Sequence, residues 1–154
     1  MTGKELIYLD DMVLTYFCGA KEFRGSLKES RGIEALRIAV LSGTANLVAS
    51  FAHRAALRKY LHRGRRARMA GIVRFAPVKL MKRNKRFYEL FRLIRGTGLD
   101  RGDAAHAAIA RLIGATLLTF DKEMLRLAHA HKALFGKVVT PSQWLGHANA
   151  AEEE

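Results

Sequence analysis

Two acidic residues frame the segment LDRGDAAHAAIARLIGATLLTFD, which covers residues 99–121. Asp103 begins an alanine-rich run, where an acid serves as the N-cap or in the first turn of a helix, and Gly114 ends that helix. The apolar run 115–119 predicts a buried strand, with Asp121 at its C-terminal end. Ligand sites in open α/β sheets lie at such strand ends, so both acids are expected at one edge of the sheet. The structural alternative is that Asp103 only caps its helix and Asp121 only starts the next one.

A third acid follows another apolar run near the start of the chain. The run 6–9 predicts a strand, and Asp10 and Asp11 come directly after it. If the two strands are parallel neighbours, Asp10, Asp103 and Asp121 converge. Crowded carboxylates raise one another's pKa unless a cation neutralises them, and Mg²⁺ and Mn²⁺ prefer oxygen ligands. The sequence therefore predicts an acidic metal site.

These motifs resemble those of the PIN-domain nucleases, which include the VapC-like toxins. In YLDDMVL, Asp10 matches the first acid of the family and Val13-Leu14 match its apolar pair. DAAHAAIARLIGATLLTFD matches the later pattern, with Asp103 and Asp121 as acids and Thr119 as the hydroxyl, and VVTPSQWL is similar to the last short strand of the family. The resemblance implies a three-layer α/β/α sandwich with a mainly parallel sheet of four to five strands. It also implies that Asp10, Asp103 and Asp121 bind Mg²⁺ or Mn²⁺, and that Thr119 hydrogen-bonds an acid or a water.

Two positions depart from the family pattern. Asp11-Met12 replace the Ser/Thr-Asn that follows the first acid. The family also carries a glutamate in the helix after the second strand, whereas VLSGTANLVASFAHRAAL contains no acid, and that position maps onto Asn46, Val48 or Ser50. Asp11 is the candidate to replace the missing charge, although its side chain is expected to point away from that of Asp10. With one acid fewer, we expect weak metal binding.

Positive charge is concentrated in the middle of the chain. The net charge is +13, and residues 54–101 hold 16 basic residues against two acidic ones. A solvated surface is the ordinary explanation of a charge run, but such an excess repels itself unless a polyanion binds it, and phosphate backbones are the natural partner. The candidate nucleic-acid-binding residues are Arg63, Arg65, Arg66, Arg68, Lys82, Arg83, Lys85 and Arg86. Aromatic residues among them are expected mainly in the core, with base stacking as the alternative.

The remaining elements follow from apolar periodicity and turn residues. We expect helices over 11–19, 44–61, 79–95 and 122–134, strands over 38–41, 72–78 and 138–139, and a loop over 21–32. The composition, 49% hydrophobic over 154 residues, predicts one domain over 1–147 followed by a flexible tail over 148–154. There is no Walker A loop or zinc-site spacing. Without a membrane-length apolar run or a signal-peptide pattern, and with Cys18 as the single cysteine, we expect a cytoplasmic protein.

Two functions remain open at this point. The first is a Mg²⁺- or Mn²⁺-dependent ribonuclease of the VapC-like type, and the resemblance implies a small antitoxin partner and a homodimer. The second is a PIN-like domain with weakened or absent catalysis that binds RNA or protein. The absent glutamate favours the second function, and the three aspartates favour the first.

Overall fold

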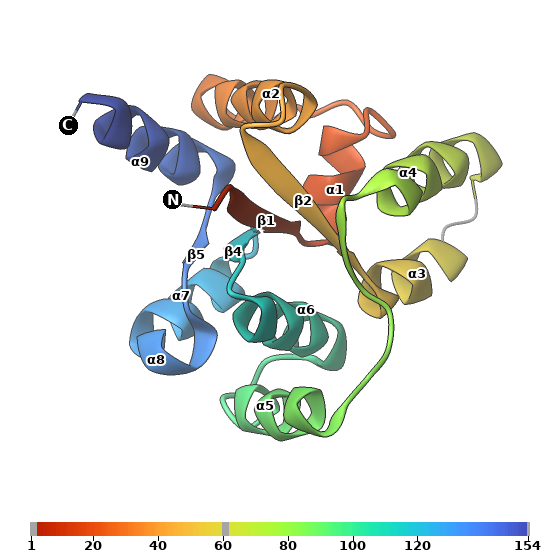
Figure 1. Cartoon of the computed structure of the whole chain (residues 1–154), viewed down its shortest axis with the longest axis vertical. Helices are drawn as coiled ribbons and strands as arrows, with labels where there is room; N and C mark the ends of the chain where they lie inside the picture. Colours follow the sequence, from red (N-terminus) through yellow and green to blue (C-terminus); the bar gives the residue numbers. More distant parts are fainter. Residues whose placement is uncertain (1–2, 60–61, 154) are drawn as a thin grey trace.

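The computed structural model of the chain describes residues 3–59 and 62–153, and its centre is a parallel sheet (Figure 1). The sheet has five strands in the order β3-β2-β1-β4-β5, and every neighbouring pair is parallel. The strands are β1 (Glu5–Leu9), β2 (Ala45–Ser50), β3 (Val78–Leu80), β4 (Thr116–Leu118) and β5 (Val138–Val139).

Helices cover both faces of this sheet (Figure 1). On one face lie α1 (Asp11–Phe17), α2 (Leu27–Leu41), α4 (Arg63–Phe75) and α9 (Pro141–Glu153). On the other lie α5 (Lys85–Arg95), α6 (Arg101–Ile113), α7 (Lys122–Ala130) and α8 (Lys132–Phe135). The helix α3 (Phe51–Arg58) follows β2 directly. The predicted three-layer α/β/α class with a parallel sheet is confirmed.

The alternation of side chains along β1 explains its unbroken apolar sequence. Ile7 and Leu9 point into the core beneath α1, α2 and α4, while Tyr8 points into the opposite core beneath α5 and α6. All three side chains are fully buried. Because helices cover both faces of the sheet, neither side of a central parallel strand contacts solvent, and its sequence is continuously hydrophobic.

The second strand lies elsewhere than the sequence predicts. Residues 38–41 are the end of α2, where Ile38 and Leu41 are largely exposed, and the predicted helix 44–61 divides into β2 and α3. A four-residue apolar run cannot by itself distinguish a strand from part of a helix. Ser26 caps the helix by accepting a hydrogen bond from the backbone N–H of Glu29, and α2 extends from Leu27 through the rest of the expected loop and the expected strand.

Four further boundaries differ from the prediction. The third strand covers only Val78–Leu80, because 72–75 still belong to α4. Helix α6 begins at Arg101 rather than at Asp103, because Asp100 is its N-cap. The expected helix over 122–134 is interrupted at His131, and α9 continues through the expected tail to Glu153. No helix in the described ranges 3–59 and 62–153 has both the length and the apolar composition to cross a membrane.

Candidate functional site

The strand order places a crevice at the end of β1. The strands β2 and β3 follow β1 in the chain and lie on one side of it, whereas the later strands β4 and β5 lie on its other side. In open parallel sheets, ligands bind at the carboxyl ends of the strands where the order reverses in this way. Asp10 follows β1 and Asp121 lies three residues beyond β4, so both acids stand at this reversal point.

Asp10 is held rigidly at this edge. It is 5% exposed, and its Oδ1 accepts the backbone N–H of Val13 at 2.9 Å, which makes it the N-cap of α1. The buried hydroxyl of Thr119 donates to its Oδ2, and the same hydroxyl oxygen accepts the backbone N–H of Asp121 at 3.0 Å. Burial raises the pKa of Asp10, and the bonds from Thr119 and Val13 offset part of that rise.

Asp103 comes to the same place from α6. Asp100 accepts the backbone N–H of Asp103 at 2.9 Å, so Asp103 lies half-buried in the first turn of the helix. Burial and the nearby carboxylates of Asp100, Asp121 and Asp10 raise the pKa of Asp103 to about 7. Asp121 is exposed and caps α7 through the backbone N–H of Met124 at 2.8 Å. These four aspartates (Asp10, Asp100, Asp103 and Asp121) form the acidic edge of the sheet.

The acidic edge fits a divalent cation in charge and in donor type. Burial raises the pKa values of Asp10 and Asp103, and the neighbouring carboxylates add to the rise at Asp103, so a bound cation would favour the ionised forms. As the side chains stand in the described part of the chain, no three His, Cys, Asp or Glu residues are arranged to hold a metal ion. Binding a cation would therefore require the side chains of the acidic edge to turn toward it.

A buried polar network lies beside the acidic edge, and the sequence analysis did not foresee it. The Tyr8 hydroxyl lies 2.8 Å from Ser50 Oγ and 2.6 Å from His106 Nδ1. On the other side of its ring, His106 Nε2 lies 2.9 Å from Asp11 Oδ1. His106 is 2% exposed, whereas the Asp11 side chain is 47% exposed, so Asp11 is the end of the network that meets solvent.

The charges in this network reinforce one another. Burial alone would raise the pKa of Asp11 and lower that of His106. The hydrogen bond and ion pair between them dominate, so the pKa of Asp11 is lowered and that of His106 is raised. Asp11, the candidate to replace the missing charge, is thus paired with His106. The sequence signals for this network are the position of His106 one helical turn after Asp103 and the polar tip of Tyr8 inside an apolar run.

His53 takes part in the network from α3. Its Nε2 lies 2.6 Å from the carbonyl oxygen of Leu9, its ring stacks on Tyr8 at 4.5 Å, and its centroid is 5.2 Å from that of His106. Burial, followed by the charge of His106, lowers the pKa of His53 to about 4, so it is neutral at pH 7. Its Nδ1 therefore accepts the backbone N–H of Ser50, while its Nε2–H donates to Leu9.

The three candidate positions for the missing glutamate lie on β2 rather than in a helix. Ser50 reaches the network and caps α3 through the backbone N–H of Ala52 at 3.2 Å. Val48 packs in the core beneath α6, and Asn46 is partly buried at the register position opposite Leu6. His53 is the polar side chain of α3 that faces the network, and it carries no negative charge.

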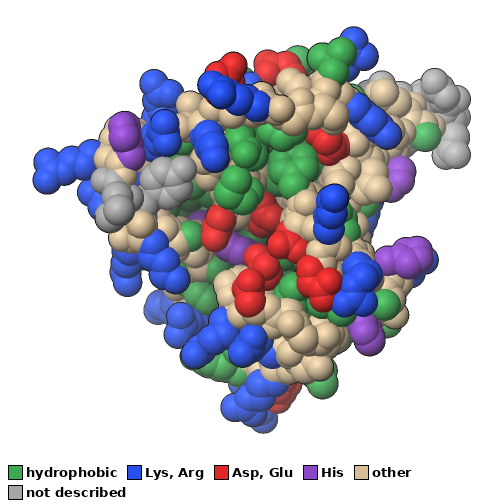
Figure 2. Space-filling model, turned by 180° about the vertical axis from the view of Figure 1, so that it is seen from behind, with side chains coloured by type: hydrophobic (Ala, Val, Ile, Leu, Met, Phe, Trp, Pro, Cys, Tyr) green, Lys and Arg blue, Asp and Glu red, His purple; other side chains and the backbone are tan. Residues whose placement is uncertain are grey.

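The predicted basic residues lie on the protein surface, and four of them line two grooves that share Arg58. All eight are exposed, four of them on α4 and the other four between β3 and the first turn of α5. Arg58 of α3 lines one groove with Arg63 and Arg66, and another with Lys82 and Arg83. We call this surface the basic belt, and it comprises Arg54, Arg58, Arg63, Arg65, Arg66, Lys82 and Arg83. Figure 2 shows acidic side chains gathered at the centre of one face, with lysine and arginine side chains around them.

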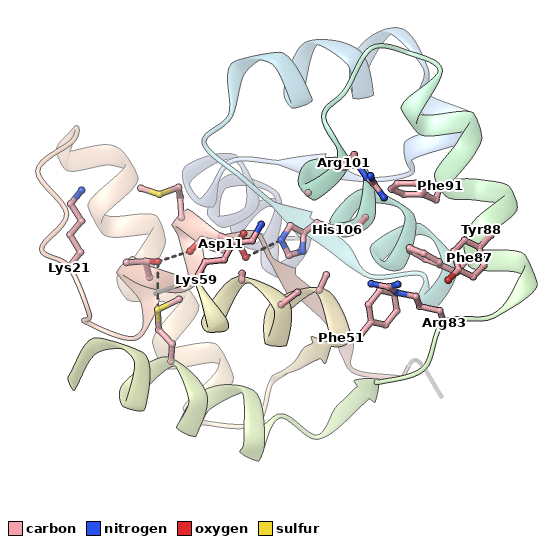
Figure 3. A pocket seen from close by; sticks show the side chains of 18 residues that line it. Asp11, Lys21, Phe51, Lys59, Arg83, Phe87, Tyr88, Phe91, Arg101 and His106 are labelled. Carbon is pink, nitrogen blue, oxygen red and sulfur yellow. Dashed lines mark hydrogen bonds and ion pairs between the residues drawn. The ribbon is translucent and has the colours of Figure 1, made fainter. Parts of the chain in front are cut away.

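A hollow of about 540 Å³ opens beside the network, between α1, α3, α5 and α6 (Figure 3). Phe51, Phe87, Tyr88 and Phe91 lie at one end of this hollow, Asp11 and His106 lie nearer its middle, and Lys21 lies at the opposite end (Figure 3). We call this cavity the central hollow. Its other charged lining residues are cationic, namely Lys21, Lys59, Arg83 and Arg101.

Comparison with known proteins supports the fold. No protein-family model matches the sequence, and no curated protein is similar enough to count as a match. Among solved structures, the crystal structure of FitAcB from Neisseria gonorrhoeae is similar with a TM-score of 0.57 and 14% sequence identity. The alignment covers 88% of this chain and 97% of that chain. At this identity the similarity concerns the fold alone, and it supports the α/β architecture described above.

Proposed function

We propose that this protein is a divalent-metal-dependent ribonuclease of the PIN-domain, VapC-like type. The observation that carries the proposal is the acidic edge at the strand-order reversal, where burial and the neighbouring acids raise the pKa of Asp103 to about 7. A site that holds several carboxyl groups close together, although their mutual repulsion disfavours ionisation, is typical of cation binding. The basic belt beside it supplies the attraction for a phosphate backbone.

Each residue contributes through its position. Asp10, Asp103 and Asp121 would hold Mg²⁺ or Mn²⁺, which when bound activates a water and neutralises charge on the phosphodiester. Thr119 and the N–H of Val13 fix the Asp10 carboxylate, so that one ligand is already oriented before the substrate arrives. The basic belt binds phosphates on either side of the scissile bond and keeps the RNA at the acidic edge.

A cleavage assay tests this proposal. Highly purified protein should cut a labelled single-stranded RNA in the presence of Mn²⁺ or Mg²⁺, and chelation should stop it. Asp103→Asn should reduce the rate at least about a hundredfold, because it removes one ligand of the cation. Glu123→Gln, an exposed acid in the first turn of α7, should cleave like the natural protein.

A second candidate function is RNA or protein binding with weak or absent catalysis. It is favoured by the neutral His53 on α3 and by the lack of three assembled donor side chains within residues 3–59 and 62–153. Salt-sensitive RNA binding without metal-dependent cleavage would decide for this function. Cleavage that Asp103→Asn abolishes would decide against it.

We also propose a small antitoxin partner and a homodimer, on the basis of the VapC-like motifs. The similarity to FitAcB is consistent with this proposal at the level of the fold. Production of the chain should slow growth of a bacterial host, and a protein encoded beside it should restore growth. Light scattering of the purified chain measures its oligomeric state directly.

A further inference from the structure

The end of the central hollow away from Asp11 is a cluster of aromatic rings. Phe87 lies at its centre and is 3% exposed, and its ring meets Phe51 edge-on at 5.0 Å and stacks with Phe91 at 5.6 Å. Tyr88 lies 5.4 Å from Phe87 and is 42% exposed. Phe87 therefore holds the cluster in place, while Phe51, Tyr88 and Phe91 offer accessible surface to the hollow (Figure 3).

An arginine completes this aromatic end. The guanidinium carbon of Arg83 lies 5.2 Å from the centroid of the Phe51 ring, and Arg83 is also part of the basic belt. Flat aromatic and guanidinium groups bind the faces of unstacked nucleobases, whatever the base. The aromatic end thus combines a surface for a base with a cation for the phosphate attached to it.

The charge of the hollow favours a nucleotide over an apolar peptide. Among the described lining residues, four are cationic and Asp11 alone is acidic, and Asp11 is paired with His106. Of these cations, Arg83 and Arg101 lie beside the aromatic rings, and Lys21 lies at the opposite end of the hollow (Figure 3). Cations beside aromatic rings are complementary to a base that carries its phosphate. A purely apolar occupant would leave these cations without a partner.

We propose that the aromatic end of the central hollow, formed by Phe51, Tyr88, Phe91 and Arg83, binds one unpaired nucleobase of an RNA strand that lies on the basic belt. This inference rests on the proposed function and deepens it, since it names single-stranded RNA with an exposed base as the substrate. Bases that remain paired in a duplex are not free to enter, so the hollow selects against double-stranded RNA.

The test measures binding without divalent ions, so that it is independent of cleavage. The probe is a single-stranded octaribonucleotide with 2-aminopurine at its centre, compared with the same RNA with an abasic central position and with its duplex. The variants are Tyr88→Ala and Arg83→Gln. Phe75→Ala and Arg31→Gln are matched controls, because Phe75 is an 81% exposed ring beneath Arg74 and Arg31 is exposed on α2. Neither control residue lines the hollow.

The proposal predicts a specific pattern of affinities. Tyr88→Ala should bind the single strand roughly tenfold more weakly with an unchanged salt dependence, since base stacking is not a charge interaction. Arg83→Gln should also lower the steepness of the salt dependence, and Phe75→Ala should bind like the natural protein. The abasic RNA should bind the natural protein roughly tenfold more weakly, and Tyr88→Ala should cause little additional loss with it.

Several results would overturn the inference. The first is equal affinity of the protein for the abasic, duplex and single-stranded RNAs. The second is an equal loss of affinity from Tyr88→Ala and Phe75→Ala. The third is displacement of the probe by an apolar peptide, together with full affinity for the abasic RNA. Cleavage without any dependence on the base would reject the subsite and leave the nuclease proposal intact. Base-dependent binding without cleavage would reject the nuclease proposal alone.

Discussion

At the scale of single residues, the site is a set of carboxyl groups with unlike surroundings. Asp10 is buried and held by two hydrogen bonds, Asp11 is paired with a buried histidine, and Asp103 is left among other acids. The pKa directions follow these surroundings: lowered for Asp11 and raised for Asp10 and Asp103. The carboxyl groups with raised pKa values are therefore those that lie where the proposed cation would bind.

The raised pKa of Asp103 makes stability depend on pH. Its pKa is about 7 in the folded protein and near the ordinary aspartate value of 3.8 when unfolded. Between these values the folded state binds more protons, so ionisation of Asp103 lowers the free energy of unfolding as the pH rises from about 4 to about 7. The Asp103→Asn variant lacks this ionisation. Its free energy of unfolding, relative to that of the natural protein, should therefore rise between pH 5 and pH 8. Thermal melting of both proteins across this range measures the difference.

Glu123→Gln is the control for this pH dependence. Glu123 is exposed, and its hydrogen bond with Arg126 lowers its pKa, so it does not change protonation between pH 5 and pH 8. Its stability relative to the natural protein should stay constant across the range. A constant difference for Asp103→Asn as well would mean that Asp103 ionises normally.

At the scale of elements, the approach of α2 to α9 depends on one missing side chain. A Cβ at Gly32 of α2 would lie 2.5 Å from the carbonyl carbon of Pro141 and 2.6 Å from the nitrogen of Ser142, both in the backbone of α9. The same contact is stabilised by Glu29, which accepts the backbone N–H of Ser142 at 2.9 Å. Backbone atoms cannot move aside as a flexible side chain can, so only glycine permits this packing.

Gly32→Ala should therefore destabilise the protein. Alanine in a helix normally gains about 1 kcal/mol over glycine, but the overlap with α9 should outweigh this gain and leave a net loss of about 1–3 kcal/mol. Gly71→Ala in α4 is the matched control, since nothing lies within 4 Å of its Cβ position, and it should gain about 0.5–1 kcal/mol. Urea unfolding of both variants gives the two values. A stabilised Gly32→Ala would show that α9 can move away.

At the scale of the whole molecule, the charge is separated rather than balanced. The central segment, which carries most of the positive charge, folds into α3, α4 and α5, and its arginines and lysines meet along the basic belt. The acids gather at the strand ends beside this belt (Figure 2). RNA held by the belt would thus pass the acidic edge, where a cation is needed to offset repulsion from the phosphates.

The belt predicts a steep salt dependence of RNA binding. Replacing Arg63, Arg65 and Arg66 with glutamine should reduce the slope of log affinity against log salt by about 2, since each contact with single-stranded RNA contributes about 0.7. Arg68 stays unchanged because it also donates to the carbonyl oxygen of Gly19. Replacing the exposed residues Lys28, Arg31 and Lys132 with glutamine removes the same charge elsewhere and should change the slope much less. Equal slopes for both triple variants would place the RNA path off α4.

The local sequence was enough to predict the elements that carry the three principal aspartates. The unbroken apolar runs of β1 and β4 have to be buried on both faces, and the acids that follow them have to lie at the strand ends. The end of α6 could also be predicted from the sequence, because Gly114 adopts the left-handed conformation, with φ 76°, that residues with an L side chain disfavour. The parallel α/β class follows from these segments together with β5.

Tertiary contacts decided the elements and residues that the sequence left ambiguous. Residues 38–41 and 45–50 are both short apolar runs, and only the space beside β1 determines that the second run is the strand. His53, Ser50, Tyr8 and His106 are separated by up to 98 positions along the chain, so no local pattern could predict that they share hydrogen bonds. Burial lowers the pKa of His53 and raises that of Asp103, while the contact with Asp11 raises the pKa of His106. Burial and such contacts are properties of the folded chain rather than of sequence neighbours.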